Sequence, residues 1–203
     1  MMVRRSLLVL ALALSVARCA EQPTAVKQPA GPQFLKWTGT PQFTAQTRAR
    51  RSGAMAMMNP PLSLEQYSVS FWAVRGESRS IRINYSSTID NDTHPFLELT
   101  TTDPVFAPEI GEIAVGDSVL ITVTVDTSKI GVRFEPTGLQ FGTASQLKIY
   151  YGGASGDLNG DGVANDDDAQ IESQLLGLWY REYTNDDWSP VSASQSAADK
   201  SFM

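Results

Sequence analysis

Apolar and polar residues alternate along several short segments between residues 63 and 153. Alternation of this kind, with β-branched and aromatic residues at the apolar positions, is typical of strands that bury one face. The predicted strands are "YSVSFWAV" (67–74), "SIRINY" (80–85), "SVLITVTVD" (118–126), "GVRFEP" (131–136) and "SQLKIYY" (145–151). Turn-forming Gly, Pro, Asp and Asn separate them. Residues 63–153 are therefore predicted to form an all-β domain, an antiparallel β-sandwich of the Ig-like kind.

The segment before this domain has a different composition. Residues 20–62 show little periodicity and are rich in Pro, Gly, Gln, Ala and Thr. The stretch "EQPTAVKQPAGP" is typical of a linker, and the double proline at Pro60 and Pro61 interrupts regular secondary structure. We therefore expect residues 20–62 to be a tether, with the folded domain beginning near Ser63.

The N-terminus has the pattern of an export signal over residues 1–19. Arg4 and Arg5 precede the apolar run "SLLVLALALSVA". This run is shorter than the ~20 apolar residues of a membrane-spanning helix. The chain is therefore expected to be exported, as a cell-envelope lipoprotein or a secreted protein.

A single cysteine, Cys19, follows that run, so the sequence offers no internal disulfide. The stretch "SVARCA" resembles the lipobox of bacterial lipoproteins, in which the cysteine becomes the lipidated first residue. Arg18 departs from that pattern, which has a small residue before the cysteine. The resemblance implies that the chain contacts the membrane through a lipid anchor on Cys19. The alternative is cleavage after Ala17, with Ser15 and Ala17 as the small-residue pair.

The charge of the chain argues against one class of partner. Its 203 residues carry a formal net charge of −6, and a composition of 42% hydrophobic and 19% charged residues is ordinary for a globular protein. Nucleic-acid-binding proteins present a basic face to phosphate. The local basic cluster of Arg48, Arg50 and Arg51 falls within the expected linker. We therefore expect no nucleic-acid partner.

The stretch "GDLNGDGVANDDDAQIE" (156–172) concentrates acidic and amide side chains without a basic residue. Counted from Asp157, oxygen ligands fall at positions 1, 3, 5, 7, 9 and 12, the ligand spacing of an EF-hand calcium loop. Glycine at position 6 permits the sharp turn that such a loop needs. The predicted ligands are Asp157, Asn159, Asp161, the backbone carbonyl of Val163, Asn165 and Asp168. The alternative is an Asx-rich turn without a metal.

A short helix is predicted to follow the loop, over "DDDAQIESQLLG" (166–177). Asn165 suits its N-cap, and the aspartates after it bring negative charge to the positive end of the helix dipole. Ile171 and Leu175 lie one turn apart, and Gly177 favours the end of the helix.

Residues 156–177 resemble one repeat of the dockerin modules of secreted bacterial and archaeal proteins. Two features distinguish them from an ordinary EF-hand, because position 12 is Asp and no helix is predicted before the loop. The resemblance implies Ca²⁺ as the cofactor and, for a complete dockerin, docking to a cohesin partner. Dockerins carry two repeats, but "YREYTNDDWSP" lacks a second Asp-x-Asn-x-Asp-Gly. We therefore expect calcium to be structural, with docking as the alternative.

A looser resemblance covers "VLITVTVDTSKIGVRFEPTGLQFGTASQLKIYYGG" (119–153). This stretch is similar to the C-terminal half of the β-sandwich domain shared by ankyrins and netrin receptors. In that domain a strand run is followed by a P-x-G-x-x-F turn and an apolar strand, and Pro136, Gly138 and Phe141 match the turn. The resemblance implies an extracytoplasmic sandwich and names no partner.

No set of catalytic residues is recognisable in the sequence. His94 falls in the predicted turn "DNDTHP", and there is no nucleophile elbow, zinc spacing or phosphate-binding loop. We therefore expect a non-enzymatic protein whose β domain binds a protein or polysaccharide partner at the cell surface. The alternative is a carbohydrate-active protein, for which Glu109 and Glu112 would be the acid–base pair to consider.

The last segment, residues 179–203, is predicted to be an aromatic-rich tail. Its aromatic residues either pack the loop and helix onto the β domain or bind a sugar or partner surface. Packing is favoured, because one loop–helix unit buries too little surface to be stable alone. The aromatic residues in question are Trp179, Tyr180, Tyr183 and Trp188.

Overall fold

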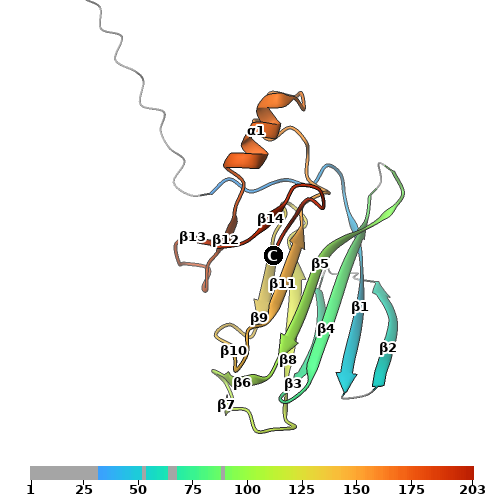
Figure 1. Cartoon of the computed structure of the whole chain (residues 1–203), viewed down its shortest axis with the longest axis vertical. Helices are drawn as coiled ribbons and strands as arrows, with labels where there is room; N and C mark the ends of the chain where they lie inside the picture. Colours follow the sequence, from blue (N-terminus) through green and yellow to red (C-terminus); the bar gives the residue numbers. More distant parts are fainter. Residues whose placement is uncertain (1–31, 52–53, 64–67, 88–89) are drawn as a thin grey trace, which may run out of the picture. The chain divides into compact units, whose positions relative to one another are not determined.

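The computed structural model describes residues 32–51, 54–63, 68–87 and 90–203 (Figure 1). The export signal and Cys19 lie outside the described residues. The chain divides into the units Met1–Ala30 and Gly31–Met203, and only the second is described. It consists of antiparallel strands and one short helix, which confirms the expected all-β class.

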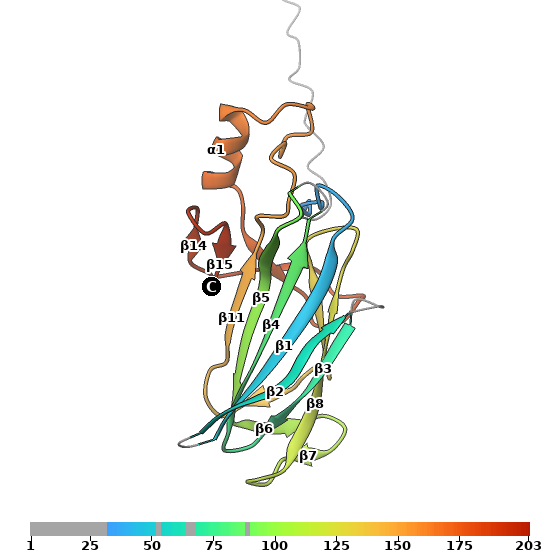
Figure 2. The same cartoon turned by 90° about the vertical axis from the view of Figure 1, so that its right-hand side faces the viewer.

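The larger sheet has seven strands in the order β14-β15-β11-β5-β4-β1-β2, and every neighbouring pair is antiparallel (Figure 2). Its strands are β1 (Gln42–Arg51), β2 (Ala54–Ser63), β4 (Ser78–Ser86), β5 (Thr93–Thr102), β11 (Gln146–Tyr150), β14 (Gln195–Ser196) and β15 (Ser201–Phe202). Strands from the beginning and the end of the described chain therefore belong to one sheet.

The remaining strands form smaller antiparallel sheets with the orders β3-β8-β9, β10-β6-β7 and β12-β13. Their strands are β3 (Ser68–Val74), β6 (Pro104–Ala107), β7 (Gly111–Glu112), β8 (Ser118–Val125), β9 (Val132–Glu135), β10 (Gln140–Phe141), β12 (Leu178–Tyr180) and β13 (Ser189–Val191). The five strands predicted from alternation correspond to β3, β4, β8, β9 and β11. Their ends differ from the predicted ones by at most two residues.

One hydrophobic core contains residues of the larger sheet and of the β3-β8-β9 sheet. In β3, β4 and β8 the buried positions recur at every second residue, as the alternation predicts: Val69, Phe71, Ala73, Ile81, Ile83, Tyr85, Val119, Ile121, Val123 and Val125. Side chains that alternate across a strand place one set in the core and leave the other in solvent.

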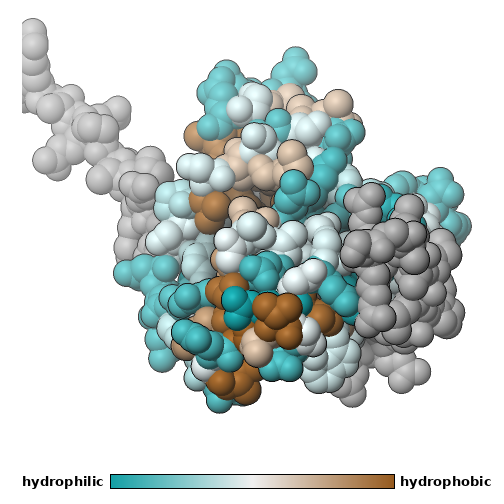
Figure 3. Space-filling view, turned by 60° about the horizontal axis from the view of Figure 1, so that its bottom comes forward, coloured by the Kyte–Doolittle hydropathy of each residue, from teal (hydrophilic) through white to brown (hydrophobic). Residues whose placement is uncertain are grey.

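The outer face of β3 and β8 shows the polar half of the same alternation. The hydroxyls of Ser70 and Thr122 lie 2.8 Å apart in a cross-strand pair. Trp72 pairs with Leu120 on this face and is 56% exposed. Other apolar side chains reach the surface between polar ones at the end of the molecule that carries β6 and β7, where Ile110 and Val115 are exposed (Figure 3).

The linker prediction is wrong for the residues that form β1. This strand lies between β2 and β4 and pairs with β4 from Gln42 to Arg50. Phe43 and Ala45 are buried in the core. The fold therefore begins well before Ser63, while residues 20–31 of the expected linker lie outside the described part. Because proline and glutamine residues surround this short alternation, the sequence pattern did not predict β1. The strand is recognised from its pairing with the distant strand β4.

Trp37 attaches the segment before β1 to the core. Its indole N–H donates hydrogen bonds to the carbonyls of Asp126 and Lys129, both at 3.0 Å. Its ring packs against Phe43 and Phe96, with centroids 5.4 and 5.1 Å apart. An aromatic ring that fills core volume and donates its N–H to the β8–β9 turn is part of the domain rather than of a tether.

Strand β5 was not predicted, and the reason is a β-bulge. Leu97 pairs with Ile83 and Pro95 pairs with Asn84, so Phe96 is an extra residue opposite β4. Phe96 and Leu97 are consequently both buried. A bulge shifts the alternation by one residue, which hides the period of two in "THPFLELTTT".

The C-terminal segment is more than the predicted tail. Strand β15 pairs with β11, with Phe202 opposite Ile149, and Ser201 and Phe202 are buried. The final residues therefore extend the larger sheet. In the described part of the chain, no helix has the length and apolar character needed to cross a membrane.

Candidate functional site

The predicted calcium loop is wound around the carboxylate of its first residue, Asp157. Oδ1 accepts hydrogen bonds from the N–H groups of Gly160 and Asp161 at 2.7 and 3.1 Å, and Oδ2 accepts from Gly162 at 2.9 Å. Gly160 and Gly162 have φ values of +82° and +92°, a left-handed conformation that glycine adopts without a Cβ penalty. The two glycines therefore let three successive N–H groups face one carboxylate.

The middle of the loop is held by its own polar side chains. The Asn159 side chain donates to Asp161 Oδ2 at 3.1 Å and accepts from the Asp161 N–H at 2.9 Å. Asp161 Oδ1 accepts from the N–H of Val163 at 2.8 Å, and the Val163 side chain is exposed. These bonds tie positions 3, 5 and 7 of the predicted site together.

Asp168 closes the loop onto its own beginning. Its side chain is buried, Oδ1 accepts from the N–H groups of Leu158 and Asn159 at 2.6 and 3.0 Å, and Oδ2 accepts from Asn165 at 2.9 Å. The pKa of the Asp168 carboxyl is lowered, mainly by the hydrogen bond from the Asn165 N–H and further by those from Asn159 and Leu158. Desolvation raises the pKa but does not outweigh these hydrogen bonds. The carboxylate form of Asp168 is therefore favoured.

One continuous set of hydrogen bonds joins five of the six predicted ligand residues. The sixth residue, Val163, belongs to the same set through its backbone N–H. Among the described residues, the loop aspartates form no ion pair with a basic side chain, and no three Asp, Glu, His or Cys side chains are grouped to hold a metal ion. In this arrangement the negative charge of the loop is compensated by backbone N–H groups.

The helix predicted after the loop is α1 (Asp166–Gln174). Asn165 is its N-cap, and Asn165 and Asp168 form a reciprocal capping box, which confirms the predicted start. The predicted end is wrong, because the helix stops at Gln174 with Leu175 as its C-cap, before Gly177. Leu175 is exposed rather than packed, so the apolar spacing overestimated the length of the helix.

Glu172 attaches α1 to the C-terminal strands. Both of its carboxylate oxygens lie 2.6 Å from the Lys200 ammonium, and the Tyr151 hydroxyl donates to one of them at 3.0 Å. The Gln195 amide donates to the Tyr151 hydroxyl and to the Glu172 carbonyl, at 3.0 and 3.1 Å. The helix that follows the loop is thus bonded to β14 and to the residue before β15.

The aromatic residues after α1 do not act as one unit. Trp188 packs against Phe34, with ring centroids 4.8 Å apart, and lies under the Arg181 guanidinium. Trp179, Tyr180 and Tyr183 are exposed. Packing onto the domain therefore applies to Trp188 and not to the whole group. The glutamates predicted as the alternative acid–base pair, Glu109 and Glu112, are both exposed, and Glu112 is the last residue of β7.

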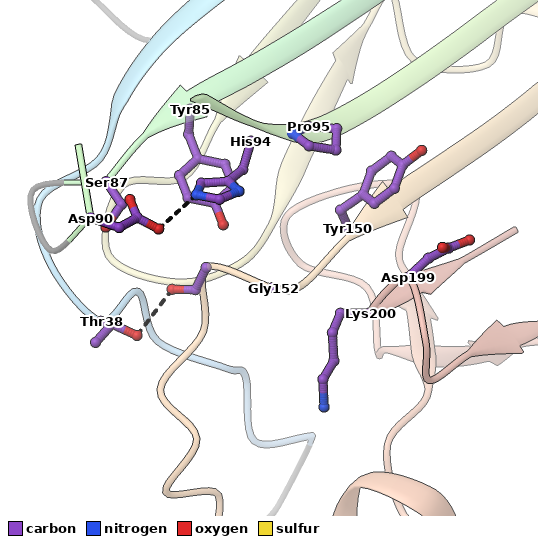
Figure 4. Close-up of a pocket in the computed structure, with 11 residues that line it drawn as sticks. Thr38, Tyr85, Ser87, Asp90, His94, Pro95, Tyr150, Gly152, Asp199 and Lys200 are labelled. Atoms are coloured by element: carbon purple, nitrogen blue, oxygen red, sulfur yellow. Dashed lines mark hydrogen bonds and ion pairs between the residues drawn. The ribbon is translucent and has the colours of Figure 1, made fainter. Parts of the chain in front are cut away.

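A pocket of about 300 Å³ lies where the larger sheet meets the turn that leads into the loop (Figure 4). Tyr85 and His94, an opposed pair on β4 and β5, stand on one side of it, and Tyr150 of β11 stands on the other. Thr38, Gly152, Asp199 and Lys200 complete much of its lining.

His94 was expected to be a turn residue, but it lies in β5 and its Nε2 is 2.8 Å from Asp90 Oδ2. The pKa of the Asp90 carboxyl is lowered, mainly by a hydrogen bond from the Asp92 N–H and next by its hydrogen bond with the His94 side chain. No sequence signal pointed to the pocket, because its residues come from separate stretches of the chain.

Comparisons with protein-family models, curated proteins and solved structures find no match for this chain.

Proposed function

We propose that this chain is an exported, non-enzymatic protein in which an Ig-like β-sandwich serves as an interaction domain and the loop 157–168 binds one structural Ca²⁺. The observation that carries the calcium proposal is the winding of the loop around the Asp157 carboxylate. An acidic loop that turns at two left-handed glycines and closes on Asp168 has the chain path that the ligand spacing requires.

The donor chemistry of the loop fits Ca²⁺, which prefers hard oxygen ligands. The proposed ligands are Asp157, Asn159, Asp161, the carbonyl of Val163, Asn165 and Asp168. Each carboxylate oxygen has about two acceptor sites, so an oxygen that accepts one N–H retains capacity for a cation. Backbone N–H groups, and no basic side chain of the described residues, offset the charge of the three aspartates, so a cation would neutralise it further.

The ion would supply charge neutralisation and no chemistry on a substrate. Asn165 and Asp168 are both proposed ligands and the capping residues of α1. Glu172 of the same helix is bonded to Lys200 and Tyr151. A cation that fixes the loop would therefore also fix the start of α1, and through Glu172 it would favour the observed position of the C-terminal strands.

Several observations support a sandwich for the β domain. The strands are antiparallel, and inward residues of the larger sheet and of the β3-β8-β9 sheet belong to one core. Two antiparallel sheets that share one core are the defining feature of a β-sandwich.

Export and anchoring are proposed from the sequence of residues 1–19. Lipidation of Cys19 would place the domain at the cell envelope. Radiolabelled palmitate is expected to enter the wild-type protein in the source cell and not a Cys19→Ser variant. A mature protein that begins at Arg18 would contradict the anchor.

The calcium proposal is tested by calorimetry on the full chain after chelator treatment. Titrated Ca²⁺ should bind with a Kd of about 10⁻⁴ to 10⁻³ M, as in extracellular modules, and Mg²⁺ should compete poorly. A ligand that binds only the folded state stabilises it by about 2.7 kcal/mol at a hundredfold excess over Kd. The α1 region should therefore melt at a higher temperature with calcium than with chelator.

Variants locate the ion. Asp157→Ala and Asp161→Ala should abolish the binding heat, whereas Asp167→Asn, a matched change in the first turn of α1, should retain it. Equal melting of the α1 region with calcium and with chelator would falsify the proposal.

A further inference from the structure

The charged groups around the pocket between Tyr85, His94 and Tyr150 already have bonded partners. Asp90 is bonded to His94 at 2.8 Å, Lys148 lies 3.3 Å from Asp199, and Lys200 is bonded to Glu172 at 2.6 Å. Charged groups that already have partners do not demand a counter-ion. The pocket therefore suits a neutral ligand better than a phosphate or a metal ion.

The walls of the pocket combine aromatic faces with hydrogen-bonding groups. The Tyr85 and His94 rings have centroids 5.4 Å apart, and Figure 4 shows Tyr150 across from them. The Asp90 and Asp199 carboxylates are about half exposed, at 46% and 58%, so their remaining acceptor sites are open to a ligand. Such a pocket offers apolar contact to C–H groups and acceptors to hydroxyl groups in the same place.

A sugar ring has this combination, because its faces carry C–H groups and its edge carries neutral hydroxyls that donate hydrogen bonds. The pocket volume of about 300 Å³ lies at the lower end of the range for small-molecule sites. That volume suits a ligand of about one sugar ring.

We propose that this pocket binds one neutral sugar unit, with Tyr150 as an aromatic wall and Asp90 and Asp199 as hydroxyl acceptors. The unit is a free monosaccharide or the end of a polysaccharide, which share this chemistry. The pocket contains none of the proposed calcium ligands, so either proposal can fail alone.

Gly152 offers a way to fill the pocket without disturbing the fold. A β-carbon there would lie 3.7 Å from Lys200 Cβ and 3.9 Å from the Tyr85 hydroxyl oxygen, both ordinary contact distances. Gly152→Ala should therefore fold while it narrows the pocket. Tyr150→Ala removes one wall. Trp72→Ala is the matched control, since Trp72 is an exposed aromatic residue on another sheet.

The experiment uses saturation-transfer NMR on the full chain. One arm contains glucose, galactose, mannose, xylose and N-acetylglucosamine, and a second contains cellohexaose and maltohexaose. Methyl phosphate and glycine, whose C–H protons give a signal, serve as charged probes. At least one sugar should give a saturable signal. A signal in the first arm indicates a free monosaccharide as the ligand, and a signal confined to the second arm indicates the end of a polysaccharide.

Binding should weaken about tenfold in Tyr150→Ala and in Gly152→Ala and stay unchanged in Trp72→Ala. If Tyr150→Ala fails to fold, Gly152→Ala decides the result. The proposal is overturned if no sugar in either arm gives a saturable signal, if only methyl phosphate or glycine binds, or if Gly152→Ala binds as tightly as the wild type.

Discussion

The Trp37 ring lies directly against Gly153, so closely that a β-carbon on the glycine would be 2.6 Å from a ring carbon. The backbones of the two segments also pair, since the Thr38 N–H donates to the Gly153 carbonyl at 3.0 Å. The segment before β1 and the turn that leads to the acidic loop are thus joined through one glycine. Only a residue without a side chain permits this approach.

Gly153→Ala should consequently destabilise the protein by about 1–3 kcal/mol, the usual cost of an overpacked core. The new β-carbon would also meet the Tyr85 ring at 2.9 Å, so neither neighbour could move freely. Urea unfolding followed by fluorescence measures the effect. Gly152→Ala is the control and should change stability by less than about 0.5 kcal/mol. Equal stability of both variants would contradict the close approach of Trp37.

Phe43→Ala tests whether the segment before Ser63 belongs to the fold. Phe43 is 3% exposed and packs on Trp37 and Phe96. Its truncation should cost about 3–5 kcal/mol, as for large core residues. Gln42→Ala, at the exposed neighbouring position, should cost less than about 0.5 kcal/mol. Chemical denaturation measures both, and a neutral Phe43→Ala would restore the linker interpretation.

Glu172→Gln should loosen α1 from the C-terminal strands. The variant loses the charge that binds Lys200, in a pair that is partly exposed, so the expected cost is about 1 kcal/mol or less. Hydrogen exchange should accelerate at the amides of α1 and of Ser201 and leave β4 unchanged. The control is Glu182→Gln at an exposed position. Unchanged exchange in α1 would show that Glu172 does not hold the helix.

Asp126 should contribute an acid-sensitive part of the stability. Burial raises the pKa of its carboxyl, but the hydroxyl and N–H of Ser128 and the charge of Lys129 outweigh it and lower the pKa. The folded protein then binds this proton more weakly than the unfolded chain, whose Asp pKa is about 3.9. The contribution is therefore complete above that value and is lost as the pH falls through the lower pKa of the folded state.

The stability difference between the wild type and Asp126→Asn should accordingly be largest above about pH 5 and shrink below about pH 4. Urea denaturation at several pH values measures this difference. Asp187→Asn, at an exposed position, should show no such trend. A difference that is constant from neutral to acidic pH would contradict the role of the Asp126 charge.

Local spacing in the sequence was sufficient to predict the strands β3, β4, β8, β9 and β11 and the first residue of α1. The positions of Val69 and Phe71, or of Asn165 and Asp168, depend on neighbours a few residues away, through strand alternation and helix capping. The turn predicted at Gly162 is likewise local, because Asp157 bonds to N–H groups only three to five residues later.

The tertiary structure alone decided the place of β1, β5 and β15 and the existence of the pocket. Strand β1 is a strand because β4 pairs with it, and the bulge at Phe96 removes the alternation that would have revealed β5. The pocket joins residues as distant as Tyr85 and Lys200. The residue order within one segment does not show which distant segment it pairs with, because that pairing depends on the surface that the other segment supplies.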